Sequence, residues 1–268
     1  MFHTIKHGTL EYLTADALEG STHCFSTRLG GVSEGVLSAL NLGTHRGDKP
    51  ENVRGNYRIL GKAVGFAPEE TVFTRQEHTD LLLRVGRADC GTGLDREQTT
   101  VCDGILTDEP GVVLVCFAAD CTPVLLFDPV RQAIAAVHAG WRGTAQGIAY
   151  KAVLRMQEEF GCAPEDIRAA IGPCIGRCCF EVGPEVSDAM REALGADAEA
   201  AIEPRGEKAH VDLKLLNRIW LQKAGVQVID VSPDCTMCHP DRFWSHRVTG
   251  GARGSQAAII RLKGGAAQ

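Results

Sequence analysis

A cysteine and a histidine stand where a β-hairpin would bring them together. Cys121 and His138 flank two apolar runs, residues 124–127 and 132–137, which have the length and composition of strands. A hairpin that turns at residues 129–130 places the two side chains opposite each other, with Cα atoms roughly 4.5 to 5.5 Å apart. A thiolate and an imidazole at that separation can share a metal ion or a proton, so this stretch has the character of an active site.

The elements that position this pair follow from apolar periodicity and from glycine and proline punctuation. A third apolar run, residues 112–119, precedes the hairpin. Helix 48–65 is expected to have Pro50 in its first turn, and helix 144–160 to have Thr144 as its N-cap. Further helices are expected at 184–194 and 213–224, and further strands at 71–74, 81–85, 167–171 and 226–231.

This order of elements predicts one α+β domain over residues 1–268. We see no internal repeat. The segment 195–208, rich in Ala, Glu and Gly, is too short for a domain linker and is expected to be a surface excursion.

Composition restricts the function classes. The net charge of -6 and the lack of a basic cluster argue against nucleic-acid binding. No apolar run approaches the ~20 residues of a membrane span, and the N-terminus does not have the pattern of an export signal. We therefore expect a cytoplasmic protein whose 11 cysteines are reduced thiols.

The run FSTRLGG, residues 25–31, has the chemistry of a binding loop. Ser26 and Arg28 supply donors, and Gly30 lets the backbone approach a ligand closely. The Arg28 guanidinium is suited to grip an oxyanion such as phosphate through two parallel hydrogen bonds. Asn41 and Arg142 are weaker candidates for substrate contacts, Arg142 because it precedes a helix N-terminus, which favours anions.

Two further segments are rich in thiols. Cys174, Cys178 and Cys179 lie within residues 172–183, and Cys235 and Cys238 form a C-x-x-C-H sequence. Haem attachment through that sequence needs an export route, and the chain shows no sign of using one, so haem is not expected. A second zinc site is a further reading, but a strong signal has two spaced ligand pairs and only one C-x-x-C exists. Packing of these thiols is the expectation.

Several long motifs resemble one family. They are the run at residues 25–48, the QEH triplet ending at His78, the segments AADCTPVLL and AVHAGWRGT, and GPCIGRCCFEVG. Together these are similar to the YfiH-like family, known as polyphenol oxidases or laccases and as zinc-dependent purine nucleoside phosphorylases. The resemblance covers nearly the whole chain. It implies mixed β-sheets packed in layers with flanking helices, in the α/β/β/α arrangement of the CNF1/YfiH-like fold.

The resemblance also implies a metal held by His78, Cys121 and His138. One thiolate and two imidazoles suit Zn²⁺, with Cu²⁺ possible, and three protein ligands leave a fourth position open, as in catalytic sites. Two departures from the family pattern stand out. Glu77 and Thr79 flank His78 where Val and Gly are usual, and a second arginine is missing near the C-terminus, where Arg253 stands at a different offset.

The activity that the resemblance implies is cleavage of inosine, adenosine or guanosine by phosphate to give the base and ribose 1-phosphate. Adenosine deamination and methylthioadenosine cleavage are implied as well. Arg28 would hold phosphate beside Cys121 and His138. The proton-shuttling group has no motif, and Asp120 and Glu77 are candidates by adjacency only. Substrate contacts are expected from Ser26, Gly30, Asn41, Asp120 and Arg142.

Three alternatives remain open. A multicopper oxidase needs many histidines, usually in HxH pairs, and the nine here are scattered without one. A cysteine hydrolase would use Cys121 as nucleophile and His138 as base, but such a dyad does not need His78. A metal-storage or redox-sensing protein would bind metal without turnover. The partners expected are small molecules, with the oligomeric state open.

Overall fold

Two six-stranded sheets form the centre of the molecule. The computed structural model describes residues 1–264. The first sheet has the order β1 (Phe2–His7), β2 (Leu10–Ala15), β3 (Ser21–Ser26), β15 (Gln256–Leu262), β7 (Val113–Ala118) and β4 (Thr71–Phe73). The second has the order β14 (Val228–Val231), β10 (Arg168–Ile171), β8 (Thr122–Asp128), β9 (Ala133–Ala139), β6 (Gly104–Thr107) and β5 (Leu82–Arg84).

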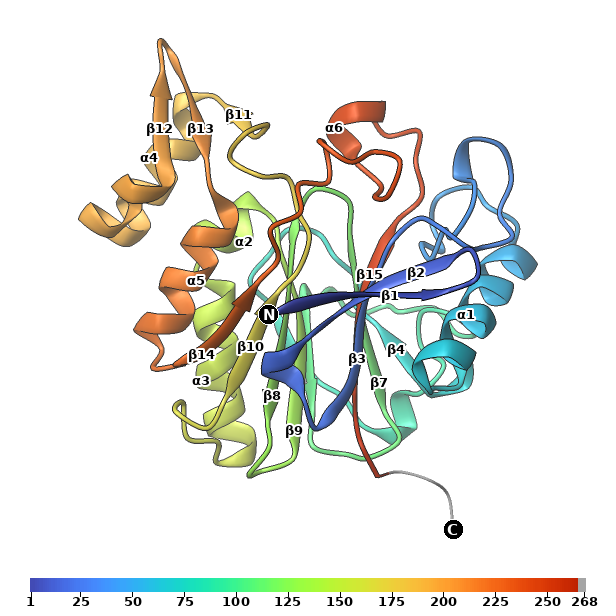
Figure 1. Ribbon diagram of the computed structural model, residues 1–268. Coiled ribbons are helices and arrows are strands. Elements are labelled where there is room, and N and C mark those ends of the chain that lie inside the picture. The colour runs from blue at the N-terminus through green and yellow to red at the C-terminus, as the bar shows by residue number, and fades with distance from the viewer. Residues whose placement is uncertain (265–268) are drawn as a thin grey trace.

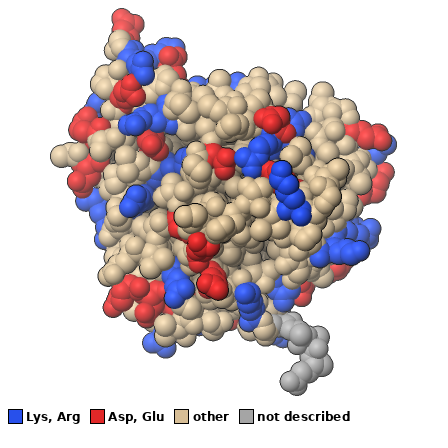
Figure 2. All heavy atoms as spheres, in the orientation of Figure 1, with Lys and Arg blue, Asp and Glu red and all other residues tan. Residues whose placement is uncertain are grey.

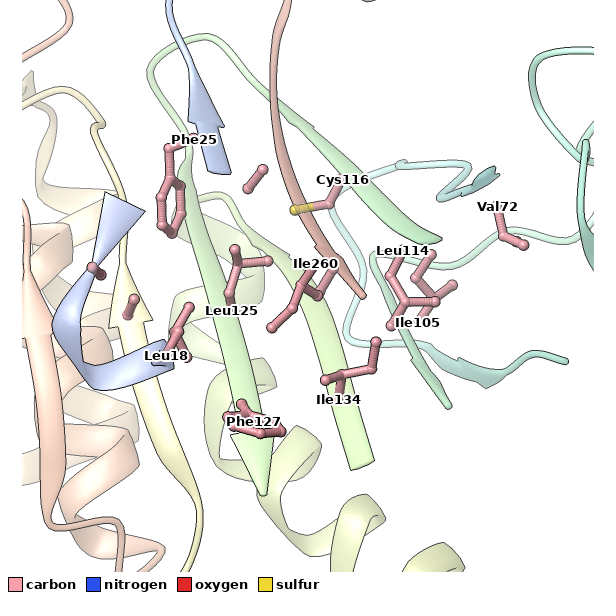
Figure 3. Close-up of a cluster of buried hydrophobic side chains, with 14 of the residues drawn as sticks. Leu18, Phe25, Val72, Ile105, Leu114, Cys116, Leu125, Phe127, Ile134 and Ile260 are labelled. Carbon is pink, nitrogen blue, oxygen red and sulfur yellow. The ribbon is translucent and has the colours of Figure 1, made fainter. Parts of the chain in front are cut away.

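Side chains from both sheets interlock in a shared core. Leu114 and Ile260 of the first sheet pack in one cluster with Leu125, Phe127 and Ile134 of the second (Figure 3). Alternate residues of the same strands face the other way, since Val113 and Val115 pack towards helix α1. Both faces of these strands are therefore buried, which explains their nearly continuous apolar sequences.

Helices cover the outer face of each sheet (Figure 1). Helix α1 (Pro50–Val64) packs Val53, Tyr57 and Leu60 onto the first sheet. Helices α3 (Ile148–Phe160) and α5 (Leu213–Lys223) pack onto the second sheet. The resulting order of layers is α/β/β/α, so the predicted fold class is confirmed. The short α2 (Trp141–Ala145) and α6 (His246–Thr249) lie in connections, and 3-10 turns are η1 (Asp16–Leu18), η2 (Gly35–Leu37), η3 (Pro68–Glu70) and η4 (Arg87–Asp89).

A small third sheet extends from one end of the molecule. It has the order β11 (Glu181–Val182), β13 (Lys208–Val211) and β12 (Ile202–Arg205), and α4 (Pro184–Leu194) packs beside it. The predicted surface excursion at 195–208 is only partly correct. Its first half is the 3-10 helix η5 (Gly195–Ala201), in which Ala198 and Ala201 are fully buried. Only the turn between β12 and β13 projects from the body (Figure 1).

The predicted helix 144–160 is interrupted. Thr144 is a buried residue inside α2, and the N-cap of α3 is Gly147, whose φ of 72° lies in the left-handed region. Trp220 holds the break in place, because its Nε1 donates to the carbonyl oxygen of Thr144 at 2.7 Å. The prediction of Thr144 as N-cap was wrong because a tertiary contact outweighed the local pattern.

The predicted register of the β8–β9 hairpin is off by two residues. His138 lies opposite Pro123, and Thr122 lies opposite Ala139. The turn is longer than expected because the last pair is Asp128 with Ala133. A shift of two residues keeps every side chain on the same face of a sheet, so Cys121 remains diagonal to His138 on one side.

The surface in Figure 2 carries interspersed acidic and basic side chains. On this face the described residues form no continuous basic area of the kind that follows a phosphate backbone. No helix among residues 1–264 is long and apolar enough to cross a membrane.

Candidate metal centre and active-site cavity

Three segments meet near Cys121. His78 lies in the connection between β4 and β5, Cys121 in the turn between β7 and β8, and His138 within β9. The Cys121 Sγ is 3.7 Å from the His78 Nε2, and the two imidazole rings lie edge to face with centroids 5.0 Å apart. One ligand atom from each residue lies within 4.8 Å of the others. The structure thus brings together the three residues predicted as metal ligands.

A buried carboxylate, Asp103, orients both histidines. Its Oδ1 is 2.8 Å from the His138 Nδ1 and accepts the backbone N–H of His78 at 3.0 Å. Its Oδ2 accepts from the backbone N–H and the hydroxyl of Thr79, at 2.8 and 2.7 Å. Burial opposes ionisation, but the hydrogen bond with His138 and these further donors lower the Asp103 pKa to about 2. An ionised Asp103 fixes the His138 ring so that its other nitrogen is free to bind a metal.

The backbone at His78 is strained. Its φ is 61°, a left-handed conformation that costs a non-glycine residue about 1–3 kcal/mol. The bonds from Asp103 to residues 77–79 hold this conformation. Strain maintained by a buried carboxylate is typical of a site that requires one side-chain direction.

The thiol and the imidazole modify each other's protonation. Burial opposes ionisation of Cys121, but the facing His138 and hydrogen bonds from both histidines outweigh it and lower the thiol pKa to about 6. Against burial, the Cys121 thiolate and Asp103 raise the His138 pKa to about 9. Cys121 is therefore a thiolate near neutral pH, which is the form that binds metals and attacks electrophiles.

The donor set fits zinc. A thiolate and two imidazoles are borderline-soft ligands, and His138 has the carboxylate partner usual for zinc-bound histidine. The three ligand atoms lie together at the wall of a cavity, so a fourth position faces open space. This arrangement matches a catalytic zinc site rather than a closed structural one.

The cavity above these residues has a volume of about 460 Å³, within the range of small-molecule sites. Aromatic and polar groups share its wall. Phe73 and Phe117 form an edge-to-face pair 5.1 Å apart. The polar and charged residues of the wall include His45, Arg46, Arg75, Gln76, Glu77, Glu97, Gln98 and Arg253.

Two arginines, Arg46 and Arg253, bring positive charge to one part of this wall. The Arg253 Nη1 donates to Gly254 O at 2.9 Å and to Ser255 Oγ at 3.3 Å, and the same hydroxyl accepts from Arg46 Nε at 3.2 Å. Within residues 1–264 the buried Nε of Arg253 has no hydrogen-bond partner. Burial, and then repulsion from Arg46, lower the Arg253 pKa to about 10. An anion bound here would relieve the repulsion between the two guanidinium groups.

The structure does not bring Arg28 into the cavity wall. Its Nη1 and Nη2 donate to the carbonyl oxygens of Pro240 and Ser38, both at 2.8 Å. Its guanidinium also stacks 3.9 Å above the centre of the Trp244 ring. Arg28 therefore ties two loops together through two of its five N–H groups.

Ser26, Gly30 and Asn41 also lie outside the cavity wall. Ser26 Oγ accepts from the backbone of Ala257 at 3.0 Å. Gly30 has a φ of 86°, and a Cβ there would lie 2.2 Å from the backbone of Leu10. Asn41 is fully buried, and its Oδ1 accepts from the backbone N–H of Gly43 and Ser255, at 3.0 Å each. Asn41 thereby positions two residues that do line the cavity.

Asp120 and Arg142 likewise lie outside the cavity wall. Asp120 has a φ of 90°, and its two carboxylate oxygens accept from Thr236 Oγ1 at 2.6 Å and from the backbone of Arg247 at 2.7 Å. Arg142 is exposed and stacks on its neighbour Trp141 at 4.2 Å. Of the two candidate proton shuttles, Glu77 lines the cavity and Asp120 does not.

Sequence reasoning missed Asp103 and the Arg46 side chain. Arg46 lies inside the motif at residues 25–48, so a signal for it was present. Asp103 has no motif of its own, and its role depends on tertiary contacts with segments 24 to 35 residues away. Arg253, noted in the sequence for its unusual offset, lies in the cavity wall.

Comparisons with known proteins agree with this geometry. A family model described as multi-copper polyphenol oxidoreductase laccase matches residues 22–263. The purine nucleoside phosphorylase YlmD of Geobacillus stearothermophilus is 38% identical over 251 residues, covering 92% of each chain. The purine nucleoside phosphorylase YfiH of Escherichia coli is 37% identical and covers 85% of this chain and 89% of its own.

Solved structures agree as well. The crystal structure of G. stearothermophilus YlmD superposes with a TM-score of 0.91 at 36% identity, covering 97% of this chain and 99% of that one. That of the Bacillus licheniformis protein YfiH has a TM-score of 0.92 at 34% identity, with coverage of 98% and 99%. Motifs, fold and coverage all lead to the same assignment: the chain belongs to the multi-copper polyphenol oxidoreductase laccase family, which includes YfiH and YlmD.

Proposed function

We propose that this protein is a zinc-dependent purine nucleoside phosphorylase. One observation carries the proposal: a single cavity joins the Cys121 and His138 cluster to the Arg46 and Arg253 pair. A nucleoside and a phosphate ion together need an open-sided catalytic centre and a separate anion site. Relatives that cover about nine tenths of the chain bear this activity in their names, which supports the same assignment.

In this proposal Arg46 and Arg253 bind phosphate. They take the role expected of Arg28 because they line the cavity and Arg28 does not. Arg253 lines the cavity and is only 9% exposed. Its guanidinium is therefore largely dehydrated and held in place before an anion binds.

The purine would bind against the aromatic part of the wall. Phe117 is half-buried and borders the cavity, while Phe73 beneath it holds the ring edge to face. Gln98 supports this part of the wall by donating to Phe73 O at 3.0 Å. Stacking on Phe117 leaves the ribose between the base and the two arginines.

His78, Cys121 and His138 would hold the zinc ion, and Cu²⁺ suits the same donors. When bound, zinc supplies Lewis-acid chemistry at its open position. In phosphorolysis a phosphate oxygen bonds to C1′ of the ribose, and the electron pair of the glycosidic bond leaves with the purine, which takes a proton. Glu77 is the carboxylate of the wall placed closest in sequence to the ligands, and we assign it the proton transfer.

Adenosine deaminase and methylthioadenosine phosphorylase activities belong to the same proposal. Adenosine and methylthioadenosine share the purine and the ribose ring of inosine and guanosine, and the polar part of the wall offers donors and acceptors to different base edges.

The alternatives fit the site less well. A multicopper oxidase needs a larger set of histidines than the two present in the ligand clusters of residues 1–264. A cysteine hydrolase is consistent with the Cys121 thiolate, but His78 Nε2 at 3.7 Å from Sγ has no role in a dyad. A protein that only stores metal does not require the arginine pair.

Chromatography of reaction products tests the proposal. Zinc-loaded protein is incubated with inosine, adenosine, guanosine or methylthioadenosine, with and without phosphate, beside a Cys121→Ala variant. We expect phosphate-dependent release of the free base, lost in the variant. Release that is independent of phosphate would support a hydrolase instead, and metal binding without any release would support storage.

A further inference from the structure

Four of the thiols expected only to pack form a second cluster. Two connections leave the same end of the second sheet, one after β10 and one after the parallel neighbouring strand β14. They run side by side, since the backbones of Cys174 and Cys235 pair in an isolated β-bridge and Thr236 N donates to Cys174 O at 3.0 Å. Each connection contributes two cysteines to the cluster: Cys178 and Cys179 from the first, Cys235 and Cys238 from the second.

The spacing of the sulfur atoms is that of metal ligands. All four lie within 4.8 Å of one another. The Cys238 Sγ is 3.6 Å from Cys178 Sγ and 3.4 Å from Cys179 Sγ. A zinc–sulfur distance of about 2.3 Å gives a tetrahedral edge of about 3.8 Å, whereas a disulfide needs about 2.05 Å. The observed distances are close to the tetrahedral edge.

The backbone accommodates a thiolate at this place. Gly176 N donates to Cys235 Sγ at 3.1 Å, and a hydrogen bond of this kind favours the charged form of the sulfur.

We propose that these four cysteines bind a structural zinc ion as a closed tetrathiolate site, separate from the site at Cys121. Four protein ligands leave no open position, so the site has no catalytic role. On binding, the thiols release their protons to solvent and no oxidant or reductant is involved. Cys174 stays outside the site, because its thiol is fully buried and contacts the carbonyl oxygen of Ile175 at 3.4 Å.

The position of the cluster shows what the ion would stabilise. Ile175 N donates to the Asp120 carbonyl oxygen at 2.9 Å, and Thr236 Oγ1 donates to the Asp120 carboxylate at 2.6 Å. Both cysteine-bearing connections thus hold Asp120, the residue next to Cys121. A zinc ion that joins the two connections would fix this turn of the active site.

Metal stoichiometry tests the proposal independently of activity. The Cys121→Ala variant, which removes one ligand of the first site, is purified after growth with zinc and its metal content is measured. We expect one bound zinc per chain. Adding Cys178→Ser and Cys238→Ser, both at exposed positions, should remove it, whereas adding the half-buried Cys90→Ser should not. Circular dichroism checks that each variant is folded.

Cobalt provides a second readout on the same variants. Co²⁺ in four thiolates gives intense charge-transfer and visible bands, and the Cys121→Ala protein should show them while the triple variant should not. Either an absence of metal in folded Cys121→Ala protein or its retention in the triple variant overturns the proposal. A disulfide among these cysteines also overturns it. Mass spectrometry would show such a bond as a mass lower by two hydrogens, in protein whose alkylation is the same with and without added zinc.

Discussion

At the scale of single residues, Asp103 is the group on which the candidate site depends. It is fully buried, and it bonds to His138 and to the backbone on both sides of His78. One side chain therefore sets the direction of two ligands that lie far apart in sequence.

Replacing Asp103 by Asn should weaken metal binding. The amide carries no charge to stabilise the His138 ring, and loss of such a partner costs about 10–100-fold in metal affinity. Competition with a chromophoric chelator measures the change. Asp108→Asn is the matched control, because Asp108 bonds to Arg84 at the surface. Equal affinities in the two variants would show that Asp103 does not act on the metal.

Replacing Arg253 by Gln should raise the KM for phosphate. Loss of hydrogen bonds to a charged group costs about 1.5–3 kcal/mol, or about 10-fold to 100-fold, and the KM for the nucleoside should change much less. Steady-state kinetics with each substrate varied in turn measure both constants. Arg191→Gln serves as control, since Arg191 pairs with Glu199 at the surface. An unchanged KM for phosphate would contradict the assignment.

At the scale of elements, the β8–β9 hairpin sets the position of Cys121 and His138. The sequence predicted the hairpin, but with a register two residues off, because the turn spans more residues than the two assumed. The ligand pair remained on one face only because the error was an even number. Residue type and alternation thus predict which side chains share a face of the sheet more reliably than they predict which residues pair through the backbone.

The break between α2 and α3 can be tested by substitution. Gly147 has a φ of 72°, which is strained for residues with a Cβ atom. We expect Gly147→Ala to lower the free energy of unfolding by about 1–2 kcal/mol. Gly147→Asn should cost less, because asparagine tolerates this conformation. Denaturant unfolding of the three proteins measures the difference, and an alanine variant as stable as the original would show that the strain is released elsewhere.

At the scale of the whole molecule, the sequence predicted the layers better than the strands that complete the first sheet. The central strands and the helices at 50–64, 184–194 and 213–223 were recognised from periodicity and glycine ends. Strands β1, β2, β3 and β15 were not predicted. Strand β15 lies between β3 and β7 although it is last in the chain, and such long-range pairing leaves no local signal. The cysteine cluster escaped prediction for the same reason.

Global stability should fall in mild acid because of His23, in β3. Its ring is buried, with Nε2 accepting from Ala15 N at 2.9 Å, and burial lowers its pKa to about 4. The unfolded chain, with a histidine pKa of about 6.5, binds a proton that the folded protein does not. The contribution of neutral His23 to the free energy of unfolding is therefore complete above pH 6.5. It decreases by about 1.4 kcal/mol per pH unit as the pH falls towards 4.

Unfolding free energies measured from pH 7.5 to 4.5 test this effect. A His23→Gln variant removes the titrating group, so its stability should depend less steeply on pH than that of the original protein. Parallel curves for the two proteins would contradict the effect.

The fate of the phosphate group tests the central claim most directly. Zinc-loaded protein with inosine and inorganic phosphate is followed by phosphorus NMR while hypoxanthine is measured in the same sample. We predict that ribose 1-phosphate appears in equal amount to hypoxanthine and that the Cys121→Ala protein forms neither. Hypoxanthine with free ribose and unchanged phosphate, or no reaction at all by the metal-loaded protein, would contradict the account.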